Sequence, residues 1–348
     1  MKKLITLLLA LLFILTACTP AVVEQAPAIE VTPEPTEESN KPTVIVLSGR
    51  YEHLGLNNFG IGDSVEKYCA SNEIEYHYID ATDNSNYDMN VKRYEELLKS
   101  SNRTVVIYEW TATNSFLEIS EKYGVETILF NASTSIYGNG GYELFFKHIV
   151  SYDKEAFAEF VTTEIAKTCD GKSALSFESH KPSGVGDPID HLLDDKMKEN
   201  KGKYDLEKTE TISVEIDDEQ FDLNEEGIQR AYWEVYFENI DTNVDQVCLF
   251  TLLGKEEWYL DQLYNLGLTD EEIFHLDYGI ANEANIKKMT DGKSDVFYGY
   301  TEEAMNKLLI STIDRIFAGE EVEEYICVEP IILTSKEQAQ AYYEEHFA

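Results

Sequence analysis

Short runs rich in β-branched residues alternate with amphipathic helical patterns along most of this chain, and this alternation most constrains its fold. The first run, Thr43 to Leu47, ends in Ser48-Gly49 and is typical of a strand buried on both faces of a parallel sheet. A helical pattern over Asn58 to Ala70 and a second strand-like run over Ile74 to Ile79 follow it. Strand and helix recur at a spacing of about 30 residues, which favours parallel sheets covered by helices.

The same alternation is present twice, which predicts two lobes. The first series runs to a strand-like segment over Glu126 to Phe130, and an irregular stretch over Asn131 to Lys147 follows. A long helical pattern over Asp153 to Cys169 opens the second series. Its strand-like runs lie over Ser173–Phe177, Lys208–Val214, Gln246–Phe250 and Ile273–Leu276. Further strand-like runs over Asp295–Tyr300 and Tyr325–Leu333 come after this series. Roughly 305 of the 348 residues take part, so we expect an α/β fold of two doubly wound parallel-sheet lobes.

The charge balance narrows the choice of partners. The chain carries 66 acidic and 28 basic side chains, a formal net charge of −38. Binding to DNA or RNA needs clustered Lys and Arg, so we expect no nucleic-acid partner. Close contact with anionic lipid is disfavoured for the same reason. A solvated surface explains the charge, and attraction of cationic ligands or calcium is the alternative.

The N-terminus has the features of an export signal. Lys2 and Lys3 precede an apolar run over Leu4 to Leu15, which is shorter than the ~20 residues that a spanning helix needs. The sequence Leu15-Thr16-Ala17-Cys18 resembles the lipobox of bacterial lipoproteins. The resemblance implies a lipoprotein signal peptide at residues 1–17, acyl chains such as palmitate on Cys18, and anchoring to the extracytoplasmic face of the cell membrane. An ordinary signal peptide with a chance cysteine is the alternative.

Proline and glutamate dominate the segment after Cys18. Residues 19–41 have almost no aromatic or periodic apolar content and cannot bury enough surface to offset the cost of ordering. We therefore expect residues 18–42 to form a disordered tether that begins at the acylated cysteine. An arm packed on the folded part is the alternative.

Motifs of common enzyme classes are missing from the sequence. It contains no P-loop, no GxSxG, no HExxH, no EF-hand loop and no GxGxxG after a strand. The seven histidines have no ligand spacing, and Cys69, Cys169, Cys248 and Cys327 form no metal-binding pattern. We expect these four cysteines to be buried free thiols, although the sequence leaves a disulfide open. The chain is therefore expected not to be an enzyme and to have no catalytic residue, metal or cofactor.

Three stretches carry a resemblance to a known family. They are Asn57-Asn58-Phe59, then His148 to Asp153 at the entry to the long helix, and residues 273–332, where a strand is expected to end in Leu276-Asp277. Their order and spacing resemble the type I periplasmic binding proteins, the ribose- and galactose-binding class of solute receptors. The resemblance implies two lobes joined by three crossings, with a small-molecule ligand between them and an ABC permease as partner. A membrane signalling receptor is the alternative partner.

The resemblance also sets the lobe boundaries and the position of the ligand. Lobe 1 is expected at residues 43–149 plus 279–322 and lobe 2 at residues 150–278 plus 323–348, with hinges where these segments meet. In such sheets the ligand lies beyond the carboxyl ends of the strands. The candidate ligand-binding residues are Tyr51, Phe59, Trp110, Asn131, Ser151, Asp277 and Tyr300.

These candidates supply two kinds of contact. The aromatic rings offer flat faces for stacking, whereas Asn131, Ser151 and Asp277 offer hydrogen-bond partners. Core packing is the alternative role for Phe59 and for Trp110, and Asp277 would otherwise be a strand-end acid.

Two departures from the family pattern weaken the assignment of a particular sugar. Residues 183–195 contain no counterpart of the family's second-lobe Arg, and Thr251 to Gly254 replaces a segment that is usually polar. Arg50 contributes almost all of the positive charge near the candidates, which disfavours an anionic ligand. We expect a lipid-anchored solute-binding protein for a small, neutral, polar ligand with a flat face, such as a sugar or a nucleoside-like compound.

Overall fold

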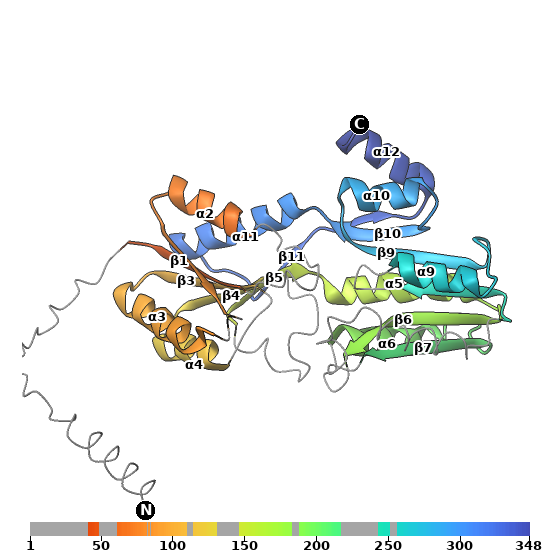
Figure 1. Ribbon diagram of the computed structural model, residues 1–348, viewed down its shortest axis with the longest axis horizontal. Coiled ribbons are helices and arrows are strands. Elements are labelled where there is room, and N and C mark those ends of the chain that lie inside the picture. Colours follow the sequence, from red (N-terminus) through yellow and green to blue (C-terminus); the bar gives the residue numbers. More distant parts are fainter. Residues whose placement is uncertain are drawn as a thin grey trace, which may run out of the picture. The chain divides into compact units, whose positions relative to one another are not determined.

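The computed structural model describes residues 41–48, 61–81, 83, 85–109, 114–130, 146–182, 188–216, 243–250 and 256–348. The expected signal peptide, Cys18 and nearly all of the expected tether lie outside these residues. The described strands form two six-stranded sheets with helices packed on them (Figure 1). No helix in the described ranges has both the length and the apolar character needed to cross a membrane.

The first sheet is entirely parallel and has the strand order β11-β5-β4-β3-β1-β2. Its strands are β1 (Thr43–Ser48), β2 (Glu75–Asp80), β3 (Thr104–Glu109), β4 (Glu126–Phe130), β5 (His148–Tyr152) and β11 (Tyr325–Val328). Every residue of β1 and β3 is buried, which is what continuous apolar runs predict for central strands.

Helices cover both faces of the first sheet. On one face, α2 (Ile61–Ser71) and α11 (Glu302–Ala318) pack against the side chains of Val44 and Val46. On the other face, α3 (Tyr87–Ser100) and α4 (Asn114–Tyr123) pack against their strand neighbours Ile45 and Leu47 (Figure 1). Because alternate residues of one strand fill two different cores, a register slip of one residue would exchange the two sets of side chains.

The second sheet has the strand order β12-β10-β9-β8-β6-β7, and only β12 is antiparallel to its neighbour. Its strands are β6 (Ala174–Pro182), β7 (Thr209–Ile216), β8 (Gln246–Phe250), β9 (Ile273–Ile280), β10 (Val296–Tyr300) and β12 (Ile331–Leu333). Helix α9 (Glu256–Asn265) precedes β9 in the chain.

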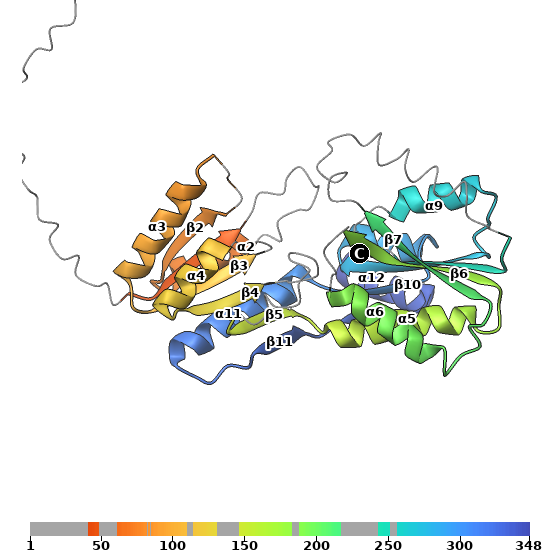
Figure 2. The same cartoon turned by 90° about the horizontal axis from the view of Figure 1, so that it is seen from below.

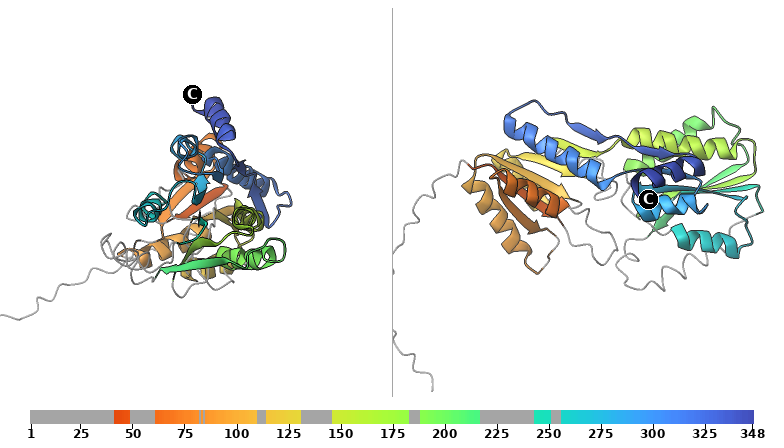
Figure 3. Two further views of the ribbon diagram at one scale, coloured as in Figure 1. Left: turned by 90° about the vertical axis from the view of Figure 1, so that its right-hand side faces the viewer. Right: turned by 90° about the horizontal axis from the view of Figure 1, so that it is seen from above.

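Helices also cover both faces of the second sheet. Helices α5 (Lys154–Cys169) and α6 (Pro188–Asn200) lie side by side (Figure 2) and share the core that contains Leu276 and Tyr298. Helices α10 (Glu283–Thr290) and α12 (Lys336–His346) lie side by side (Figure 3) and pack on the opposite face, around Phe297. The prediction of two doubly wound parallel-sheet lobes is therefore confirmed.

Capping residues in the sequence explain where several helices begin and end. The Asp153 carboxylate accepts the backbone N–H of Ala156 at 2.9 Å and starts α5. The Thr301 hydroxyl accepts the N–H of Ala304 at 3.1 Å and starts α11. Gly319 ends α11 with a φ of 73°, a left-handed conformation that glycine adopts without a Cβ clash.

The chain changes sheet three times within the described elements. It leaves the first sheet after Tyr152, returns after Tyr300 through α11, and leaves again between β11 and β12. The last change needs only Glu329 and Pro330, because β11 ends at Val328 and β12 begins at Ile331.

Sheet membership corrects the expected lobe boundaries, residues 43–149 plus 279–322 and 150–278 plus 323–348. Strand β9 continues to Ile280 and pairs in register with β10 up to Tyr300, so residues 279–300 belong to the second sheet. Strand β11 pairs with β5, so the first sheet also includes residues 150–152 and 325–328. The expected hinges at residues 149–150 and 278–279 therefore lie inside paired strands rather than at the crossings.

Candidate functional site

The carboxyl edge of the first sheet carries three polar residues at one level. Ser48 ends β1 and is in register with Asp80, which ends β2, and with Glu109, which ends β3. By strand alternation all three lie on the face of the sheet that α2 and α11 cover. We call Ser48, Asp80 and Glu109 the polar edge.

The carboxylate of Glu109 is the most buried charge of the polar edge. Its residue is 2% exposed, and Ser48, which is 1% exposed, donates its hydroxyl proton to Oε2 of Glu109 at 2.8 Å. A carboxylate has two oxygens that can each accept more than one donor, and hydrogen bonds to a charged acceptor are stronger than neutral ones. This geometry suits recognition of a hydroxyl-rich molecule and opposes an anion.

Ser151 lies on the last strand before the first crossing, and therefore in the first sheet rather than in lobe 2, where the expected boundary at residue 150 placed it. Its residue is 3% exposed, and among the described residues its hydroxyl group has no hydrogen-bond partner. It occupies β5 next to Tyr152, and its partner in the neighbouring strand β11 is Cys327. Ser151 is therefore a polar group close to the carboxyl edge of the first sheet.

An aromatic cluster of Tyr152, Phe157, Tyr278 and Tyr300 packs at two of the crossings. The ring centroids of Tyr152 and Tyr278 are 5.5 Å apart, and the rings of Tyr152 and Tyr300 are stacked at 6.4 Å. Phe157 of α5 lies 4.6 Å from the Tyr278 ring. Burial, followed by the neighbouring Tyr152 and Tyr300 hydroxyl groups, raises the pKa of Tyr278 well above its ordinary value.

Tyr300 is part of this cluster, so its ring already has a packing partner. It ends β10, as expected for a residue near the ligand, but it is only 3% exposed and stacks on Tyr152. In the described structure Tyr300 therefore links β10 to β5 across the crossing.

Asp277 differs most from its expected position. It was expected at the end of a strand, yet β9 continues for three further residues to Ile280. It is in register with Phe297 and is 2% exposed, and its Oδ2 lies 3.7 Å from Nζ of Lys288 on α10. The carboxylate thus faces a covering helix, where it has a structural ion pair.

The remaining candidates lie outside the described residues. Tyr51 and Phe59 follow β1, Trp110 follows β3, and Asn131 follows β4. These four assignments, like the acylation of Cys18, stay predictions. The strands that precede them end at Ser48, Glu109 and Phe130.

None of the three polar-edge residues is among the candidate ligand-binding residues predicted from the sequence, and Asp80 was placed outside its strand. The second strand was expected to end at Ile79, whereas β2 includes Asp80 as its last residue. An acid directly after a strand in a parallel sheet was the available signal, because the ends of neighbouring parallel strands meet at one edge.

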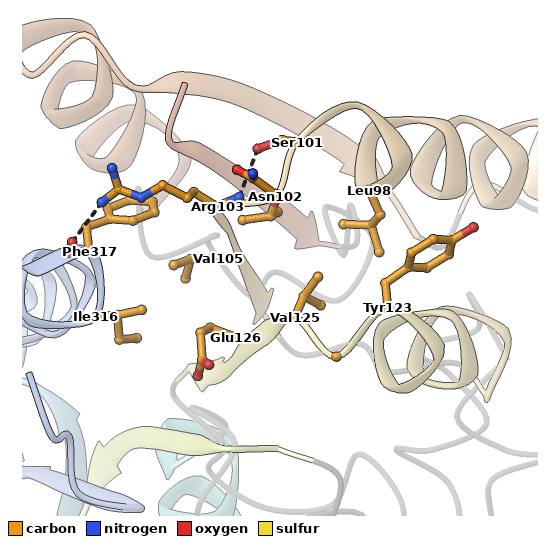
Figure 4. A pocket seen from close by; sticks show the side chains of 12 residues that line it. Leu98, Ser101, Asn102, Arg103, Val105, Tyr123, Val125, Glu126, Ile316 and Phe317 are labelled. Carbon is orange, nitrogen blue, oxygen red and sulfur yellow. Dashed lines mark hydrogen bonds between the residues drawn. The ribbon is translucent and has the colours of Figure 1, made fainter. Parts of the chain in front are cut away.

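A hollow of about 210 Å³ lies at the opposite edge of the first sheet (Figure 4). It is lined by residues at the amino ends of β3 and β4, among them Arg103, Val105 and Glu126. The Arg103 guanidinium donates a hydrogen bond to the carbonyl oxygen of Phe317 at 2.8 Å and lies 5.7 Å from the centroid of its ring. The arginine is thus engaged with α11, and the hollow is remote from the polar edge.

The two parallel-sheet lobes, joined by three crossings, have the fold of type I periplasmic binding proteins. A periplasmic solute-binding protein from Actinobacillus succinogenes with bound D-allose matches with a TM-score of 0.60 at 14% identity, covering 87% of this chain and 100% of that chain. A solute-binding protein from Bacillus halodurans with bound myo-inositol matches with a TM-score of 0.62 at 15% identity, covering 89% of this chain and 99% of that chain.

The same fold is found in a protein of another functional class. A putative LacI transcriptional regulator from Bacteroides fragilis matches with a TM-score of 0.63 at 12% identity, covering 87% of this chain and 99% of that chain. No protein-family model and no curated protein matches the sequence. At these identities the likeness defines the fold, and function has to be argued from the residues.

Proposed function

We propose that this protein is an extracytoplasmic solute-binding protein that captures a small sugar or sugar-like polyol and delivers it to an ABC importer. The polar edge is the observation that carries this proposal. Glu109, oriented by Ser48, supplies a buried acceptor at the strand ends where ligands bind in open α/β sheets. Several proteins of the same fold are described with bound allose, inositol or fucofuranose.

A neutral polyol fits this chemistry better than an anion does. Asp80 and Glu109 flank Ser48 in the register of the sheet and place negative charge at the edge. The predicted stacking residues Tyr51, Phe59 and Trp110 follow β1 and β3, which end at this edge. Together they would offer acceptors for hydroxyl groups and flat apolar faces for a ring.

The first experiment identifies the ligand. The mature chain is screened by thermal shift against pentoses, hexoses, inositols and nucleosides, and hits are measured by calorimetry. A ligand at 100 times its Kd stabilises the folded state by about 2.7 kcal/mol, which gives a clear rise in Tm. Absence of any hit among the polyols, with binding of an anionic or a peptide ligand instead, would contradict the proposal.

A pair of isosteric variants then tests the site. Glu109→Gln keeps the size of the side chain but removes its charge, and we expect a loss of affinity of about tenfold, or about 1.4 kcal/mol. The control is Glu126→Gln at the amino end of β4, where the carboxylate binds Lys147 at 2.8 Å, far from the polar edge. Equal affinities for the two variants would refute the assignment of Glu109.

The lipid anchor and the membrane partner are tested separately. Globomycin, which blocks lipoprotein processing, should leave a heavier precursor, and Cys18→Ala should release the protein from the membrane. A processed product without acyl chains would count against the anchor. An ABC permease as partner predicts ligand-dependent stimulation of ATP hydrolysis in membranes of the source organism, whereas a signalling receptor does not.

A further inference from the structure

Two cysteines far apart in the sequence meet inside the second lobe. Cys169 lies in the last turn of α5, and Cys248 lies in the middle of β8, which is central in its sheet. Their Sγ atoms are 3.3 Å apart, and both residues are 0% exposed. Bonded sulfurs are about 2.05 Å apart, so a small side-chain rotation separates this pair from a disulfide.

The other two described cysteines offer a built-in comparison. Cys69 is buried on α2 in the first lobe, and Cys327 is exposed on β11. Burial, followed by the nearby charge of Glu66, raises the pKa of Cys69 to about 12, which is typical of an inert core thiol. Within the described ranges, neither sulfur forms a hydrogen bond to another cysteine.

The surroundings of Cys169 favour its thiolate. The hydrogen bond from Cys248 is the main cause that lowers the pKa of Cys169, and Lys172 adds a nearby positive charge. Lys172 is held by the side-chain oxygen of Gln246, which lies two residues before Cys248, at 3.1 Å. These contacts hold the two sulfurs side by side in the folded lobe. Thiol–disulfide exchange itself needs only a thiolate and a second thiol, which the two cysteines supply before β8 has packed.

We propose that Cys169 and Cys248 form a structural disulfide in the exported protein. This inference rests on the extracytoplasmic location in the proposed function, because disulfides persist in oxidising compartments. The Cys169 thiolate attacks a sulfur of an oxidising protein disulfide and releases one thiol. The Cys248 thiolate then displaces the second thiol, so that the pair loses two protons and two electrons and the oxidant gains them. Because both thiols are fully buried in the fold, the exchange takes place before β8 has packed against α5.

The bond would lie entirely within the second lobe. It ties the C-terminal end of α5 to β8, whereas the N-terminal end of α5 carries Phe157 at the first crossing. Such a bond makes α5 and the second sheet one rigid body and leaves the crossings unconstrained. It should therefore stabilise the protein without changing its affinity for the ligand.

Alkylation and mass spectrometry test the proposal. The protein is isolated from the cell surface with N-ethylmaleimide present from lysis onwards, denatured, and digested with and without reduction. We expect Cys69 and Cys327 to be alkylated without reductant, and a linked peptide pair joining Cys169 to Cys248 that disappears on reduction. Four alkylated thiols, or a link to Cys69 or Cys327, would overturn the proposal.

Stability measurements provide the second arm. Reduction should lower the Tm by about 5–15 °C in the parent and in the control Cys69→Ala, but not in the double variant Cys169→Ala/Cys248→Ala. An equal response of all three proteins would overturn the proposal.

Refolding in a glutathione redox buffer separates the two possible failures. A disulfide that forms in the buffer but is absent from the protein isolated from cells would contradict the proposed extracytoplasmic location of the protein. A bond that forms in neither, in a protein that still binds its sugar, would contradict the disulfide alone.

Discussion

Gly299 is the residue at which a single added methyl group should disturb the fold most directly. It lies in β10 opposite Gly279 of β9, and an ideal Cβ built on it would be 2.0 Å from the Gly279 carbonyl oxygen. The same Cβ would be 2.6 Å from Cζ of Phe297, whose ring is fully buried. Gly299 does not have a positive φ, so a substitution here acts through steric overlap alone.

The expected cost of Gly299→Ala follows from these distances. The Cβ is about 1.4 Å closer to the carbonyl oxygen than ordinary contact allows, and a strand carbonyl cannot move aside as a flexible side chain can. Overpacking of this kind costs about 1–3 kcal/mol, and weakening one bond of the β9–β10 ladder adds about 1 kcal/mol. We therefore expect Gly299→Ala to lower the free energy of unfolding by about 3 kcal/mol, which corresponds to a fall in Tm of about 6–12 °C.

Urea denaturation followed by far-UV circular dichroism measures this loss. The matched control is Gly202→Ala in the exposed turn after α6, where the added Cβ meets its nearest atom, the carbonyl oxygen of Glu199, at 3.4 Å. The control should change stability by no more than about 0.5 kcal/mol. If the two variants unfold at the same urea concentration, the steric argument for Gly299 is refuted.

Two further substitutions probe the second lobe. Lys288→Met removes the ammonium group beside the buried carboxylate of Asp277 and should lower the free energy of unfolding by about 1–3 kcal/mol in urea denaturation. Ligand affinity, measured by calorimetry, should stay within twofold of the parent. Lys287→Met on the exposed side of α10 is the control, and a large loss of affinity in Lys288→Met would indicate that Asp277 contributes to the ligand site. Burial raises the pKa of Asp295 above its ordinary value despite the backbone N–H of His275, so folding favours its protonated form and stability is lost as the pH rises through that raised pKa. The free energy of unfolding of Asp295→Asn should therefore match that of the parent near pH 3 and exceed it increasingly towards pH 7, as measured by urea denaturation at each pH. A difference that does not change with pH would contradict a raised pKa of Asp295.

The alternation of strands and helices was enough to predict both lobes. The buried runs at β1 and β3 have no polar interruption, so burial on both faces followed directly from the sequence. Alternation does not reveal which sheet a strand joins. The two helices that flank β10 in the chain pack on different sheets, α10 on the second sheet and α11 on the first. The lobe boundaries could not be located by this pattern alone.

The end of β9 shows why the site was harder to predict than the fold. Asp277 follows an apolar run, and this pattern predicts the end of a strand, whereas pairing continues to Ile280. The charge is tolerated inside the strand because Lys288, on the next helix, reaches it. The meeting of Tyr152 with Tyr300 was equally hidden, because the two residues belong to strands of different sheets.

The two-residue link between β11 and β12 has a consequence for how the chain can fold as it is made. The first sheet lacks its edge strand until Val328 is present, and the second lacks β12 and α12 until the last residues are present. Neither lobe is thus encoded by a continuous segment, and a growing chain holds only incomplete versions of both. A polypeptide threaded through a membrane from its N-terminus would pass most of its length before either lobe could close. If the protein is exported, as proposed, this topology would delay completion of both lobes until most of the chain is available.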